Sequence, residues 1–156
     1  MSISFDPSIL LSTEIHEAND TAAIPVPEGE FVAIIEKVEP RTWQGKEDPT
    51  KSGVTLDITW SIDDANVRET LGRDKVTVRQ GIMLDLTDTG GLDMSKGRNI
   101  GLGRLREALD MNQPGQAFSM NNLSGRVAKI LVTHRLDNRN PADPKIFPEV
   151  RGVTKM

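Results

Sequence analysis

The sequence contains no cysteine and no tyrosine, and aromatic residues of any kind are scarce. Its 156 residues include two Trp and four Phe, and aromatic side chains make up 4% of the chain. Without cysteine, disulfides, thiolate zinc sites and cysteine nucleophiles are all excluded. A reducing compartment such as the cytoplasm fits this composition.

Long hydrophobic runs are also missing. No stretch is long enough to span a bilayer, and the N-terminus lacks the basic and apolar regions of a signal peptide. We therefore expect a soluble cytoplasmic protein that makes no membrane contact.

Positive charge is absent from the first 36 residues, which contain seven acidic residues and no Lys or Arg. The remaining residues hold all 19 Lys and Arg together with 16 acidic residues. The net charge of −4 thus combines an acidic arm with a mildly basic body. Because local fields matter more than the sum, this charge does not exclude a polyanionic ligand.

Catalytic motifs are poorly represented. The only histidines are His16, in the acidic arm, and His134, which shares a predicted strand face with Ile130 and Val132. That pattern favours a packed or edge histidine over a catalytic one, and no nucleophile elbow accompanies it. We expect no catalytic residues and no enzymatic activity.

Motifs for metals and phosphates are weak as well. Asp85, Asp88 and Asp93 lack the alternating ligands and terminal Glu of a calcium loop, and such runs usually form turns. Gly101-Leu-Gly103 lies inside a predicted helix and lacks the Lys-Ser/Thr of a phosphate loop. We expect neither a metal nor a cofactor.

Hydrophobic alternation predicts five β-strands. The clearest is Val54–Ile62, where every second residue is apolar and Trp60 belongs to the core face. In the third strand Gln80 interrupts the alternation, and Gly81 suggests a bulge or a sharp coil of the strand. The expected strands cover residues 31–38, 54–62, 75–86, 126–136 and 146–153.

One convincing helix follows Asn99, a predicted N-cap, with a buried stripe of Leu102, Leu105 and Leu109. A shorter helix is expected around residues 9–18, with Asp6 as its cap. We predict an all-β protein with one helix. Its body is a five-stranded barrel of the oligonucleotide-binding (OB) type, with the helix between strands three and four. The acidic arm and linker cover residues 1–28 and the barrel covers residues 29–156.

Barrels of this type commonly hold single-stranded nucleic acid on one sheet face and its loops. Trp43 lies among cations in the predicted 41–53 loop, where stacking on a base and covering the barrel end are equally supported. Cations on strands three and four form either a cationic strip or solvated outer faces. Arg139 and Lys145 flank the last hairpin loop, and Phe147 is a core residue or a second stacking platform.

The chain resembles phage-encoded single-stranded-DNA-binding proteins with an OB fold. The resemblance lies in five segments, at residues 29–35, 54–62, 103–109, 123–127 and 147–153. It implies sequence-independent binding of single-stranded DNA in phage replication or recombination, in the cytoplasm of the host cell. The implied contacts are Arg41, Trp43, Lys46, Lys51, Lys75, Arg79, Lys129, Arg135, Arg139 and Lys145.

The sequence departs from that family in its charge order. Such proteins often end in an acidic tail that recruits partners, whereas here the acidic residues lead and the chain ends in Arg151-Gly-Val-Thr-Lys-Met156. We expect the arm to occupy the cationic groove or to contact replication or recombination proteins. The oligomeric state stays open, with a homodimer as one expectation. The alternative function is a phage structural or adaptor protein that uses the barrel for protein contacts.

Overall fold

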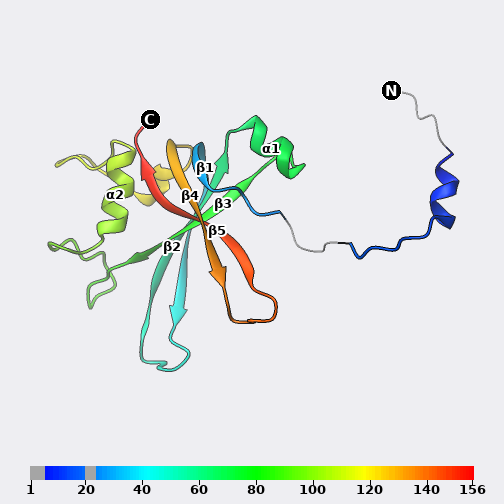
Figure 1. Ribbon diagram of the computed structural model, residues 1–156. Helices are drawn as coiled ribbons and strands as arrows, with labels where there is room; N and C mark the ends of the chain where they lie inside the picture. The colour runs from blue at the N-terminus through cyan, green and yellow to red at the C-terminus, as the bar shows by residue number, and fades with distance from the viewer. Residues whose placement is uncertain (1–5, 20–23) are drawn as a thin grey trace.

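The computed structural model describes residues 6–19 and 24–156 and contains one sheet of five antiparallel strands (Figure 1). The strand order is β3-β2-β1-β4-β5. All five expected strands are present, so the prediction of a mostly β protein is confirmed. The strands are β1 Gly29–Gln44, β2 Ser52–Ile62, β3 Thr77–Leu84, β4 Val127–Asp137 and β5 Lys145–Thr154.

Strand β1 organises the sheet because it pairs with two neighbours. Its first part, Gly29–Ile34, pairs with β4, and residues from Ala33 to Gln44 pair with β2. The register shifts between Ile35 and Lys37, which leaves Glu36 as an extra residue. Such a bulge bends a strand, which allows β1 to pass from one partner to the other. The bulge expected at Gly81 is wrong, since this residue pairs regularly with Asp57.

The sheet is open along one line. Strands β3 and β5 are its edges, and no strand pairing joins them within the described residues. Helix α2, Ile100–Ala108, contacts both edge strands. The hydrogen-bonded strands therefore form a curved sheet whose two edges meet the same helix.

The core lies on the inner face of this sheet. Trp60 is completely buried, as predicted, and its Nε1 donates to Gln80 Oε1 at 2.8 Å. This hydrogen bond explains why a polar residue interrupts the apolar alternation of β3, because a buried indole N–H needs an acceptor. Leu102 and Leu105 of α2 are buried and belong to the same core.

The helix between β3 and β4 is confirmed, and Asn99 occupies the N-cap position predicted for it, although its side chain does not act as the cap. Asn99 has a left-handed φ of 52° and its side chain makes no capping hydrogen bond. Instead, its amide accepts from the backbone N–H of Asp85 and donates to the carbonyls of Asp85 and Asp93. It therefore fixes the loop between β3 and α2.

A second helix, α1 Ala65–Leu71, was not predicted, so the expectation of a single helix is wrong. Asp64 caps it by accepting from the backbone N–H groups of Asn66 and Val67. Gly72 ends it in a left-handed conformation with φ of 64°. The helix is only seven residues long and Val67 is its one buried residue, so it has no apolar periodicity that would have indicated a helix.

The arm contains a 3-10 helix, η1 Pro7–Ser12, shorter than the predicted helix and capped by Asp6 as expected. Residues 1–5 and 20–23 of the predicted arm lie outside the described residues. Val26, placed in the linker by its proline neighbours, is buried in the core. Within the described residues, no helix is long and apolar enough to cross a membrane.

Candidate nucleic-acid interface

The predicted contact residues lie outside the core, on the outer face of the sheet and in its hairpins. Cross-strand register places six of them on the face opposite the core: Arg41, Trp43, Arg79, Lys129, Arg135 and Lys145. The others lie just before β3, in the β1–β2 loop, or in the β4–β5 turn: Lys75, Lys46, Lys51 and Arg139.

Trp43 lies in β1 and not in a loop, directly opposite Gly53 of β2. Its indole covers that glycine so closely that a Cβ there would lie 2.8 Å from three ring atoms. Trp43 is half-buried, and its Nε1 is enclosed without a hydrogen-bond partner in the described part of the chain. The indole is therefore held against its own hairpin. The bare backbone of Gly53 makes this contact possible.

The loop that follows Trp43 is a tight hairpin tip. Gly45 N–H donates to the carbonyl of Lys51 at 2.8 Å, and Asp48 accepts from Thr50 within the turn. The predicted 41–53 loop thus shrinks to residues 45–51. Lys46 and Lys51 are exposed, and neither forms an ion pair with another described residue.

Four of the ten predicted contacts are occupied by ion pairs. Arg41 Nε lies 2.8 Å from Asp57, Arg139 Nη2 lies 2.6 Å from Asp137, and Arg135 Nε lies 3.8 Å from Glu149. Lys75 pairs with Glu36. Acidic residues therefore interleave with the cations, and the outer face does not form the continuous cationic strip that the sequence suggested.

Two of these pairs also shift pKa values. The hydrogen bond to Asp57 raises the pKa of the Arg41 guanidinium above its already high ordinary value. Hydrogen bonds from the side chain and backbone of Arg139 lower the pKa of Asp137 to about 2. Arg41 and Asp137 therefore stay charged at neutral pH.

Lys129 lies in apolar surroundings on the outer face. Its neighbours across and along the strands include Ile34, Val127 and Leu131, which are 39%, 41% and 42% exposed. We call these three residues the outer apolar patch. Arg79 lies on β3 beyond the ion pairs of β1, so Lys129 and Arg79 occupy separate parts of the surface.

The β4–β5 hairpin differs from the first hairpin in its exposed apolar side chains. Phe147 lies opposite Arg135 on the outer face and is 38% exposed. The interpretation of Phe147 as a core residue is therefore wrong. Leu136 and Ile146 of the same hairpin are about half exposed.

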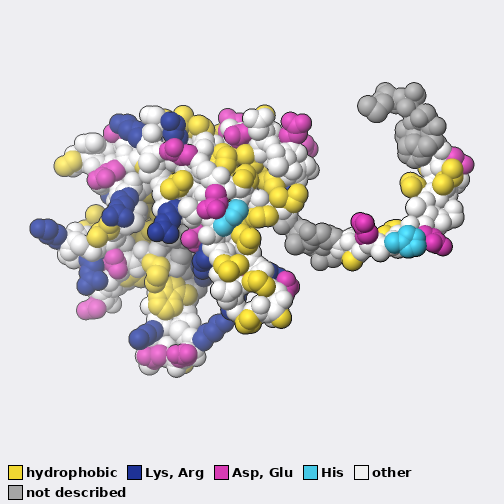
Figure 2. Space-filling model, viewed as in Figure 1, with side chains coloured by type: hydrophobic (Ala, Val, Ile, Leu, Met, Phe, Trp, Pro, Cys, Tyr) yellow, Lys and Arg dark blue, Asp and Glu magenta, His cyan; other side chains and the backbone are white. Residues whose placement is uncertain are grey.

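Sequence reasoning missed Arg104 of α2 and Arg151 of β5. Together they line a cleft of about 340 Å³ where β3, α2 and β5 meet. Arg151 is the extra residue at the bulge in β5. Their common position depends on the approach of β5 to α2, which no local sequence pattern signals. Figure 2 shows Lys and Arg side chains on the α2 side of the molecule and near the hairpin tip, with acidic side chains among them.

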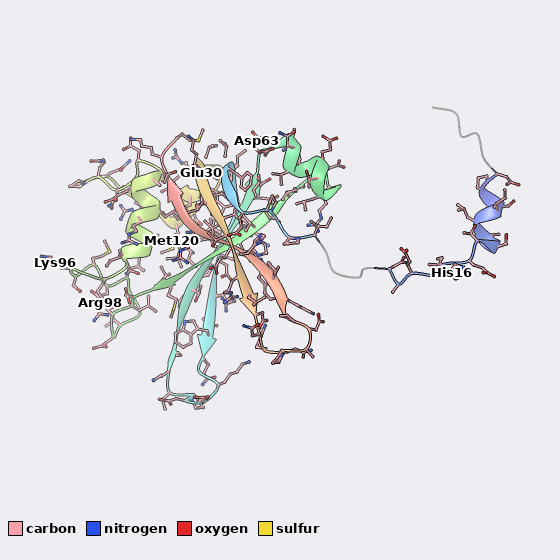
Figure 3. The ribbon with its side chains drawn as sticks, in the orientation of Figure 1. His16, Glu30, Asp63, Lys96, Arg98 and Met120 are labelled. Carbon is pink, nitrogen blue, oxygen red and sulfur yellow. The ribbon has the colours of Figure 1, made fainter. Side chains whose placement is uncertain are left out.

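His134 and two of the candidate aspartates make contacts within the protein. His134 Nε2 lies 2.6 Å from the carbonyl of Val26, and its backbone N–H donates to Glu28, which fastens the end of the linker to β4. Asp85 and Asp93 face Arg98, which Figure 3 labels beside the start of α2. The described residues contain no group of three or more potential metal ligands. No protein-family model and no curated protein matches this chain.

Proposed function

We propose that this protein binds single-stranded DNA without sequence preference, as a member of a phage replication or recombination system. We also propose that its sheet is an OB-like barrel left open between β3 and β5. The order of elements supports this architecture, because the long bent β1 pairs with both β2 and β4. The position of α2 between β3 and β4 and its contact with both edge strands agree with it.

The observation that carries the proposal is the arrangement on the β1–β2 hairpin. Trp43 is held on Gly53 next to a tip that presents Lys46 and Lys51 without ion-pair partners among the described residues. A fixed indole offers a base a stacking surface at little entropic cost, and unpaired lysines neutralise phosphates. The hairpin therefore combines the two elements that sequence-independent binding needs.

The ion-paired cations contribute less to this binding. Arg41, Arg135 and Arg139 each have a carboxylate partner, so a phosphate must compete with that partner. Binding then depends mainly on Trp43 and on the unpaired lysines, and its affinity falls steeply with salt.

Tryptophan fluorescence tests the proposal during titration with a dT oligonucleotide at low and then high salt. We expect quenching that salt reverses and that the Trp43→Phe variant lacks, because Trp60, the tryptophan that remains, is buried. Anisotropy of a labelled oligonucleotide measures binding independently of the indole. Absence of binding by both methods at low salt would overturn the proposal.

Lysine substitutions test the electrostatic part. The Lys46→Ala/Lys51→Ala variant should reduce the slope of log affinity against log salt by about 1.4, because each phosphate contact on a single strand contributes roughly 0.7. Lys96→Ala is the matched control, an exposed lysine in the loop before α2 (Figure 3). An equal change of the salt slope in the Lys46→Ala/Lys51→Ala and Lys96→Ala variants would show that the β1–β2 hairpin does not contact the phosphates preferentially.

The second candidate function is a structural or adaptor protein, and the outer apolar patch favours it. Ile34 and Val127 form a direct cross-strand pair of exposed apolar residues, and Leu131 lies on the same face. Such patches often mark protein contacts. An adaptor would show no polynucleotide binding at any salt concentration, so the same titration separates the two functions.

A further inference from the structure

The arm presents apolar side chains that the described body does not cover. Ile9, Leu10 and Leu11 are 61%, 65% and 91% exposed, and Ile15 is 74% exposed. Three consecutive exposed aliphatic residues on a short 3-10 helix cost solvation free energy unless another surface receives them. The arm therefore has the properties of a docking segment.

The cleft between β3, α2 and β5 has complementary properties. Its walls include Met83 and Val150, and the charged side chains at its rim are Arg104 and Arg151. Neither arginine forms an ion pair with a described residue. Both strands at the cleft are sheet edges, and no other strand of the described residues pairs with their free sides.

The arm and the cleft carry opposite charges. Residues 6–19 of the arm carry Asp6, Glu14 and Glu17 and no Lys or Arg. Residues 13–16 have no helix or turn, and Thr13 has an extended backbone, so this segment is available to lie along a sheet edge. An apolar helix followed by an extended acidic segment fits an apolar cleft with two arginines.

We propose that the arm of one copy docks in the β3–α2–β5 cleft of a second copy. The arm leaves the body on the side opposite α2 (Figure 1), so a second copy can offer its cleft to the arm without the linker wrapping around the body. Val26 and Glu28 fix this exit point through their contacts with His134. Reciprocal exchange of two arms gives a closed dimer with two equivalent contacts.

Sedimentation velocity of the full chain tests the proposal without DNA. We expect a concentration-dependent dimer. Leu10→Ser, Leu11→Ser and Arg104→Glu/Arg151→Glu should each weaken self-association by about tenfold or more. Lys96→Glu, an exposed control outside the cleft, should leave it unchanged. A chain that is monomeric throughout, or a dimer unaffected by the arm and cleft variants, would overturn the proposal.

Engineered cysteines then distinguish a second copy from the same copy. Because the chain has no cysteine, the Leu11→Cys and Met83→Cys proteins each carry a single thiol. In a mixture of the two, docking between copies should favour the disulfide that joins Cys at position 11 of one copy to Cys at position 83 of the other. We expect the mixed covalent dimer from this pair and not from Leu11→Cys with Lys46→Cys, whose cysteine lies at the hairpin tip. In the Leu11→Cys/Met83→Cys double variant, an intramolecular disulfide as the main product would overturn docking between copies.

Discussion

The two faces of the β1–β2 hairpin carry one tryptophan each, and the two residues are held in different ways. Trp60 on the inner face is fully buried and donates to Gln80. Trp43 on the outer face rests on Gly53, and its N–H has no partner among the described residues. Trp60 is therefore a satisfied core residue, whereas Trp43 is half-buried on the face where we propose that DNA binds. The comparison locates stability on one face and candidate binding on the other.

The largest expected effect comes from the inner face. Trp60→Ala should lower the free energy of unfolding by about 3–5 kcal/mol, because it leaves a large cavity and removes the donor to Gln80. Denaturant unfolding followed by circular dichroism measures this change. Where Trp60→Ala does not fold, Trp60→Phe retains most of the volume and should still destabilise the protein.

Trp43→Ala is the matched variant on the outer face, and its cost should be clearly smaller. The contrast between faces would fail if Trp43→Ala destabilised the protein as much as Trp60→Ala. Trp43 would then be a structural residue, and its candidate role in binding would lose its main support.

A smaller effect is expected at Gly53. A methyl group there would lie 2.8 Å from the indole, so Gly53→Ala must displace Trp43. We expect a stability loss of roughly 1–3 kcal/mol and a red shift of tryptophan emission as the ring enters water. DNA affinity should fall in parallel if the held indole is the stacking surface.

Gly152→Ala provides the control for this substitution. Gly152 also lies in a strand, but a Cβ there would have no atom within 4 Å. Its stability and emission should stay close to those of the parent protein. If Gly53→Ala behaves like Gly152→Ala, the indole moves freely and is not held by the hairpin.

Local patterns were sufficient to predict the inner face. The alternation of Val54–Ile62 identified a strand with Trp60 in the core, and the leucine spacing after Asn99 identified α2. These features are local, because burial on one face fixes the period of apolar residues. Gln80 interrupts the apolar alternation of β3, and its hydrogen bond with Trp60 explains why a polar residue lies there.

The outer face was harder to predict because its features depend on residues far apart in the sequence. The pairing of Arg41 with Asp57 spans 16 positions, and it occupies a cation that the sequence offered as a DNA contact. The bulge at Glu36 and the cleft of Arg104 and Arg151 likewise arise from strand register and tertiary packing. Trp43 was identified as a candidate, but its contact with Gly53 required the register of β1 and β2.

The smallest expected effect concerns the β4–β5 hairpin, where Arg139 donates hydrogen bonds to Asp137 at the start of the turn. Arg139 lowers the pKa of Asp137 from 3.8 to about 2 through side-chain and backbone hydrogen bonds. A depressed pKa in the folded state means that the charged carboxylate stabilises the fold. This contribution is complete above about pH 3.8 and is lost as the pH falls through about 2.

NMR titration of the Asp137 carboxyl carbon measures this pKa directly, and Arg139→Gln should return it toward its ordinary value. Because the pair is solvent-exposed, the accompanying loss of stability should be slight, far below that of Trp60→Ala. An unperturbed titration of Asp137 would mean that the turn does not hold Arg139. That guanidinium would then be available to phosphate, and the difference in free cations between the two hairpins would disappear.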